Sequence, residues 1–136
     1  MSSVVLLSGM QGLLNVTSDV ARAAGWYGYN SNLSTVAITI QNFRGRIYMQ
    51  AALALNPVES DWFPIQLVPM QDYIQYPVMI NQPTGLNGGD SGTSGYTFKA
   101  NILYIRVKVY RSYLFNSTPT QEEINALGNA RILLSL

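Results

Sequence analysis

The sequence predicts an all-β protein: a jelly-roll-like antiparallel β-sandwich with an N-terminal arm and one short helix near the C-terminus. About seven short stretches alternate between apolar and polar residues, with turn signals roughly every 8–12 residues, as is typical of a β-sandwich or a jelly roll. The strand–helix alternation of a parallel sheet is absent. The 136 residues make one domain, with an arm or first strands at 1–24 and the sandwich at 25–136.

The first 24 residues contain two short, mostly apolar runs, Val4–Leu7 and Leu13–Val16, separated by glycines. We expect an arm or short strands in this region. The segment Val16–Ala24 also fits a helical turn or two, because Thr17 or Ser18 could cap it.

The clearest strand pattern lies between residues 33 and 55. Apolar side chains occupy every second position from Val36 to Ile40 and again from Ile47 to Leu55. A period of two is typical of half-buried strands. Asn42–Gly45 separates the two runs with turn residues at both ends, so we predict a β-hairpin here.

The middle of the chain alternates between short elements and prolines. Asn56–Glu59 predicts one short helical turn, with asparagine at the N-cap, proline at N1 and Glu59 at N3. The segments 62–68 and Tyr73–Ile80 are strand candidates. Prolines interrupt both, which assigns them to sheet edges or bulges.

The next segment combines a glycine-rich loop with the longest predicted strand region. Pro83–Gly95 holds five glycines and few apolar residues, so we expect a loop. Tyr96–Tyr113 is the long strand region. Within it the odd-numbered residues 103–109 are apolar, while Arg106 and Lys108 lie on the opposite face, so the apolar face is expected to be core.

The C-terminal segment predicts a short helix near 119–127 and a last strand. Thr118 with Gln121 fits a capping box, with proline at N1, and Gly128 can end the helix. Ala130–Leu134 is the predicted last strand.

The composition favours uncharged contact surfaces. Hydrophobic residues make up 48% of the chain and charged residues only 11%, against the usual charged share of about 25%. Serine, threonine, asparagine and glutamine supply 39 residues. Such a surface repels itself weakly, which suits contact with neighbouring subunits.

The composition also excludes several classes of chemistry. Without cysteine or histidine, the chain has no thiol, no thiolate metal site and no imidazole base or ligand. The formal net charge of +1 disfavours nucleic-acid binding. No apolar run reaches the ~18 residues of a membrane span, and no early basic residue marks a secretory signal. We therefore expect a protein that is not an enzyme and needs no cofactor or metal.

An aromatic turn is the first candidate interaction site. Trp26, Tyr27, Tyr29 and Asn30 lie in a glycine-flanked segment. Trp and Tyr there could anchor a protein interface, stack on a sugar ring, or, in the case of Trp26, close the end of the sandwich.

Carboxylates and loop oxygens are the next candidates. Glu59 and Asp61 could act as a glycosidase pair or as Ca²⁺ ligands, but a role in capping and hydrogen-bonding a local turn is the preferred interpretation. Asn87 and Asp90 lie in the glycine-rich loop, which matches neither an EF-hand nor a phosphate-binding loop. We expect that loop to be a contact element.

Basic residues fall into two groups. Arg44 and Arg46 bracket the predicted hairpin turn, while Arg106, Lys108 and Arg111 follow one strand. Both groups could meet carboxylates of a neighbouring subunit, although such charges more often form a solvated face.

An ordered set of segments between residues 25 and 136 resembles small β-sandwich virion proteins of tailed bacteriophages, especially those of cyanobacteria and marine bacteria. The segments are Gly25-Trp26-Tyr27-Gly28-Tyr29, Leu33-Ser34-Thr35-Val36, Asn42-Phe43-Arg44-Gly45-Arg46-Ile47, Asn56-Pro57-Val58-Glu59-Ser60-Asp61-Trp62-Phe63, Tyr96-Thr97-Phe98, Tyr104-Ile105-Arg106-Val107-Lys108 and Ala130-Arg131-Ile132-Leu133-Leu134. The proline-rich stretch from Pro64 to Pro83 and the glycine-rich loop depart from that family.

The resemblance implies a non-enzymatic structural protein of the virion, most simply a capsid decoration or cement protein. A tail, neck or baseplate accessory protein and a glycan-binding module of a fibre are the alternatives. The expected partners are other virion proteins and copies of the chain itself, with a glycan possible and neither nucleic acid nor a membrane. The resemblance carries no catalytic or cofactor residues.

Overall fold

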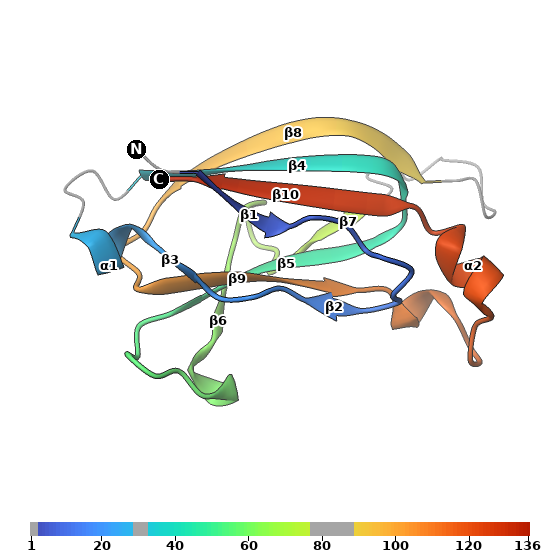
Figure 1. Ribbon diagram of the computed structural model, residues 1–136, viewed down its shortest axis with the longest axis horizontal. Helices are drawn as coiled ribbons and strands as arrows, with labels where there is room; N and C mark the ends of the chain where they lie inside the picture. The colour runs from blue at the N-terminus through green and yellow to red at the C-terminus, as the bar shows by residue number, and fades with distance from the viewer. Residues whose placement is uncertain (1–2, 29–32, 77–88) are drawn as a thin grey trace.

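Two antiparallel β-sheets pack face to face in the computed structural model, which describes residues 3–28, 33–76 and 89–136 (Figure 1). Sheet A has four strands in the order β1-β10-β4-β8. Sheet B has six, with the order β2-β9-β5-β6, while β3 also pairs with β9 and β7 with β5. The predicted β-sandwich is confirmed, and its jelly-roll connectivity stays a prediction.

The bounds of the elements are as follows. Sheet A contains β1 (Ser3–Leu7), β4 (Leu33–Phe43), β8 (Asp90–Lys99) and β10 (Asn129–Ser135). Sheet B contains β2 (Val16–Thr17), β3 (Ala21–Arg22), β5 (Gly45–Ala52), β6 (Phe63–Ile65), β7 (Ile74–Tyr76) and β9 (Tyr104–Tyr110). The helices are α1 (Ala24–Tyr27) and α2 (Gln121–Asn125), with single 3-10 turns at η1 (Glu59–Asp61) and η2 (Ser112–Leu114).

Alternating apolar residues of both sheets form the core between them. Most of the predicted inward positions are almost completely buried: Val36, Ile38, Ile40, Ile47, Met49, Ile105, Val107 and Val109. Leu53 and Leu55, which belong to the same predicted run, are 58% and 66% exposed, because β5 ends at Ala52. Each strand therefore contributes one face to the core, as its period of two predicts.

The predicted β-hairpin between residues 36 and 55 is wrong, although both of its strands exist. β4 belongs to sheet A, where β10 and β8 occupy its two edges, and β5 belongs to sheet B between β9 and β6 with β7. Neither strand has an edge left for the other. Phe43–Gly45 instead carries the chain from one sheet to the other. Gly45 has φ +148°, and a Cβ there would lie 2.5 Å from Cγ of Arg111.

The predicted loop Pro83–Gly95 is wrong from Asp90 onwards. Residues 90–95 begin β8 and pair with β4, with Gly95 opposite Ala37 and Thr93 opposite Thr39. Small residues suffice there because this edge strand faces solvent. The long strand expected over 96–113 is also two strands, β8 and β9, since the chain changes sheet at 100–103. Of the strand candidate Tyr73–Ile80, β7 covers Ile74–Tyr76, and residues 77–80 lie outside the described residues, as do 83–88.

The predicted capping box exists but lies two residues later. Oγ1 of Thr120, not of Thr118, accepts the N–H of Glu123 at 3.2 Å, and Oε1 of Glu123 accepts the N–H of Thr120 at 3.1 Å. Gln121 is free of that role and donates to the carbonyl of Gly12 at 2.8 Å. Among the described residues, none of the helices has the length and apolar character that a bilayer crossing demands.

Arg111 was expected on a charged strand face, and the structure places it in the core instead, 1% exposed. Its guanidinium donates to the carbonyls of Leu13, Leu14 and Gly128 and lies 5.6 Å from the ring centre of Phe43. Burial lowers the pKa of Arg111 to about 10, so the group stays charged at neutral pH. Arg111 follows β9 directly and continues the odd-numbered positions of Ile105, Val107 and Val109, so its side chain lies on the same inward face.

Replacing the buried guanidinium tests its structural role. We expect Arg111→Met to lower the free energy of unfolding by about 3 kcal/mol or more, because buried carbonyls lose their donor. Urea unfolding measures the change. Arg131→Met, at an exposed position of β10, is the matched control and should cost less than about 0.5 kcal/mol. Equal losses in the two variants would contradict the assignment.

Candidate functional site

The outer face of sheet A is nearly uncharged. Threonine hydroxyls pair across its strands, Thr35 with Thr97 at 2.9 Å and Thr39 with Thr93 at 3.1 Å. Its four strands carry only three charged residues: Asp90, Lys99 and Arg131. A partner that covered the middle of this face would displace water from few ions, so its desolvation cost would be low.

This face ends at β1, an edge strand that carries neither a charge nor a proline. β1 pairs only with β10, with a register shift between Val5 and Leu7. Val4 and Val5 remain 44% and 50% exposed. Natural sheets commonly protect an edge with lysine, proline or a bulge, and of these only the irregular register is present in β1.

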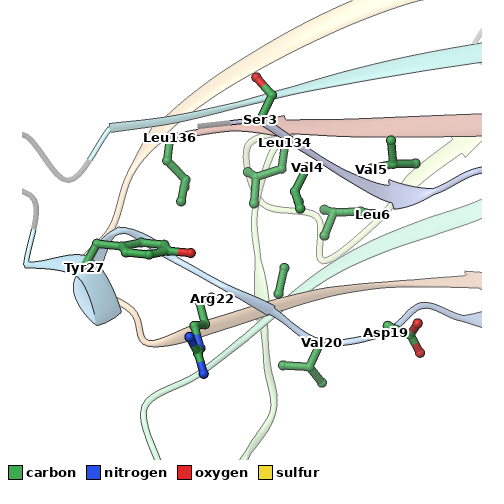
Figure 2. Close-up of a pocket in the computed structure, with 11 residues that line it drawn as sticks. Ser3, Val4, Val5, Leu6, Asp19, Val20, Arg22, Tyr27, Leu134 and Leu136 are labelled. Atoms are coloured by element: carbon green, nitrogen blue, oxygen red, sulfur yellow. The ribbon is translucent and has the colours of Figure 1, made fainter. Parts of the chain in front are cut away.

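An apolar pocket opens between β1 and β3, where the two sheets separate (Figure 2). Its volume is about 430 Å³. In Figure 2, Val4 and Leu6 point from β1 into this space, and Leu136 and the ring of Tyr27 lie at one end of it. Asp19 and Arg22 are the charged residues among its lining. The pocket therefore extends the apolar surface of the β1 edge.

The aromatic turn lies at one end of the sandwich. Gly25 packs so closely on the 102 backbone that a Cβ would lie 2.5 Å from the carbonyl oxygen of Ile102. The ring of Trp26 lies 5.6 Å from that of Tyr104, and the guanidinium of Arg22 lies 4.5 Å from the Trp26 ring centre. These contacts hold α1 on β3 and β9. Tyr27 is 47% exposed, while Tyr29 and Asn30 lie outside the described residues.

The other predicted contact residues are far from that turn. Arg46 lies between the rings of Tyr73 and Tyr113, 4.5 and 4.3 Å from their centres. It is opposite Tyr110, six residues along β9 from the Tyr104 that contacts Trp26. The backbone N–H of Arg44 donates to the carbonyl of Leu127 at 2.9 Å.

Asp90 pairs with Phe43 at the start of β8. Asn87 is not among the described residues. The five predicted interface residues that the structure describes, Trp26, Tyr27, Arg44, Arg46 and Asp90, thus do not form one site.

Tyrosines and cations share the outer face of sheet B. Tyr48 and Gln50 of β5 lie beside Lys108 and Tyr110 of β9, and these four residues line a shallow pocket of about 330 Å³. The alternation of β9 in the sequence predicts that Lys108 lies on this outer face, but it does not predict that β5 is its neighbour. The alternation in both strands contained the signal, and only the pairing of β5 with β9 brings the four residues together.

Arg106 is held at the edge of this pocket by three neighbours. Its guanidinium binds Glu59 at 2.7 Å, donates through Nε to Oε1 of Gln50 at 2.7 Å and lies 4.3 Å from the ring centre of Trp62. The hydrogen bond and charge of Arg106 lower the pKa of Glu59. At 7% exposed, Arg106 is not part of a solvated row.

The carboxylates at 59 and 61 have separate roles. Asp61, rather than Glu59, is at N3 of η1 and accepts the N–H of Val58 at 2.9 Å. The predicted hydrogen bond of Asp61 to the local backbone is confirmed, and the N3 position of Glu59 is wrong because the turn begins two residues later than the sequence predicts. No group of three or more Asp or Glu side chains within residues 3–28, 33–76 and 89–136 is arranged to hold a metal ion.

Comparison of this chain with protein-family models, curated proteins and solved structures gives no match. The geometry described above therefore carries the functional interpretation.

The Arg106–Glu59 ion pair makes stability depend on pH. Because the folded pKa of Glu59 lies below its ordinary value of 4.5, its stabilisation is complete above pH 4.5 and is lost as pH falls through the folded pKa. We expect wild type to melt above Glu59→Gln at neutral pH and the difference to close on acidification, measured by thermal melts between about pH 7 and pH 3. Glu122→Gln is the control, and a pH-independent difference would contradict the ion pair.

Proposed function

We propose that this chain is a non-enzymatic structural subunit of a tailed-phage particle that decorates the capsid by adhering to neighbouring subunits. The observation that carries the proposal is the continuous surface with few charges formed by the outer face of sheet A, the β1 edge and the adjoining pocket, which is mostly lined by apolar residues. The alternative is that the same adhesive surface serves a protein located in the tail, neck or baseplate.

The surface suits burial for two physical reasons. Its threonine hydroxyls already have partners across the strands, so contact with a neighbour leaves few polar groups unsatisfied. The β1 backbone edge can also accept a further strand, and Val4 and Val5 would be covered in the same step. Repetition on a symmetric shell would then add avidity to weak single contacts.

The strand order supports this role by analogy. Counting β2 with β3 as one interrupted strand, and β6 with β7 as another, gives eight strands in the orders 1-8-3-6 and 2-7-4-5. We propose a jelly roll on this order. Jelly rolls recur in viral capsid proteins and also in lectins, so the fold alone does not assign the function.

Purified virions of the phage that encodes the chain provide the direct test. We expect mass spectrometry to find the chain in the particle, gold-labelled antibody to place it on the head, and heads without it to lose resistance to heat or low salt. Label on the tail would contradict the capsid location and support a tail, neck or baseplate location instead. Absence of the chain from virions would overturn the proposal.

A lysine on the β1 edge should block adhesion. We expect Val5→Lys to reduce the binding of the purified chain to heads that lack it by about tenfold or more, because a lysine at this edge opposes strand addition and must be desolvated in the contact. Co-sedimentation measures the bound fraction.

Val58→Lys is the matched control for this substitution. Val58 is 61% exposed, close to the 50% of Val5. It caps η1, outside the strands of both sheets, and is not part of the β1 edge. It should leave binding unchanged. Equal losses for the two variants would show that added charge, and not the β1 edge, is responsible.

A further inference from the structure

The outer face of sheet B is unlike that of sheet A. β5 and β9 carry three cations, Arg46, Arg106 and Lys108, and no acidic residue. In three cross-strand pairs on this face a cation lies opposite an uncharged polar or aromatic side chain: Arg46 opposite Tyr110, Lys108 opposite Tyr48 and Arg106 opposite Gln50. Rings and positive charges therefore surround one another on this face.

The pocket at its centre is lined by hydrogen-bond donors and rings. Tyr48, Gln50, Lys108 and Tyr110 supply two phenol groups, a carboxamide and an ammonium. Within the described residues, the Lys108 ammonium makes neither an ion pair nor a hydrogen bond. The oxygen of Gln50 already accepts from Arg106 at 2.7 Å, so its NH₂ group is directed elsewhere as a donor.

Neighbouring contacts hold this lining in place. Arg106 is fixed by Glu59 and the ring of Trp62, and it positions Gln50 in turn. The ring of Tyr110 stacks on that of Tyr113 at 5.7 Å, and the ring of Tyr48 lies 5.4 Å from that of Tyr73. Side chains that are already ordered lose little entropy when a ligand binds.

From this arrangement we propose that the Tyr48–Gln50–Lys108–Tyr110 pocket binds an acidic sugar, with Lys108 on its carboxylate and the tyrosines against its ring. The volume of about 330 Å³ is at the small end of ligand pockets, as a single sugar residue requires. Carboxylate and hydroxyl oxygens would match the donors, and a tyrosine combines an apolar ring with a polar tip.

The charge pattern favours an acidic sugar over other polyanions. Nucleic acid would require a stripe of phosphate contacts along a groove, whereas the pocket itself contains a single cation, and Arg106 is already paired with Glu59. The pocket lies on the opposite sheet from the Thr-rich face, so this binding does not depend on the proposed capsid role.

Calorimetry on the full chain tests the proposal with three carboxylated probes: oligogalacturonate, hyaluronate oligosaccharide and oligosialic acid. We expect at least one to bind, dextran of matched length not to bind, and Lys108→Met to weaken binding by about tenfold or more through loss of a charge-assisted contact. Lys99→Met, at the end of β8 in sheet A, is the matched control and should bind as wild type does.

Each remaining outcome overturns the site. Binding to none of the probes, equal binding of dextran, or equal losses in the two lysine variants would each do so. An affinity for a DNA oligonucleotide or for polyglutamate equal to that for the oligosaccharides would show that the pocket binds polyanions in general and does not recognise a sugar. Since Lys108→Met could alter folding, Tyr110→Phe serves as a second variant that keeps the ring, and thermal melts of every variant verify the fold.

Discussion

One buried cation joins the connections at one end of the sandwich. Three segments that carry the chain between the sheets meet at Arg111: the 8–15 connection through the carbonyls of Leu13 and Leu14, the 43–45 corner through the ring of Phe43, and the residues before β10 through the carbonyl of Gly128. Figure 1 shows these connections gathered at the α2 end of the molecule. A guanidinium can donate in several directions at once, so a single side chain satisfies the carbonyls of loops that have no regular partners. The relative position of the two sheets at this end depends on it.

With the sheets held in this way, the sandwich presents two outer faces of different chemistry. Sheet A offers paired hydroxyls, small residues and an uncovered edge, whereas sheet B offers tyrosines between cations. The low charge content of the chain is thus unevenly distributed. In the proposals made above, sheet A serves the adhesion to neighbouring subunits and sheet B the binding of an acidic ligand, so both could operate on one particle at the same time.

Local patterning predicted the positions of many strands but not their partners. The alternation at Val36–Ile40, at Ile47–Ala51 and in β9 identified inward faces that are buried. The same alternation suggested a hairpin, because two adjacent strands with a short connection usually pair. Non-local partners occupy all four edges of β4 and β5, and sequence neighbours carry no information about that competition. The candidate site was less predictable from the sequence than the strands were. The sequence indicated Trp26 and Arg46, which lie apart in the structure. It did not indicate the pocket that Tyr48 forms with Lys108.

The sequence by itself determined the β class, the inward face of the main strands, the presence of a helix near the C-terminus, and the lack of thiol and imidazole chemistry. These properties depend on composition and on contacts between residues close in the chain. The tertiary structure alone decided which strands pair, which carbonyls surround the buried guanidinium of Arg111, and which polar side chains share a pocket. Each of these depends on residues separated by tens to more than a hundred positions, such as Gly12 with Gln121, and their proximity is set by the packing of two sheets and not by any local pattern.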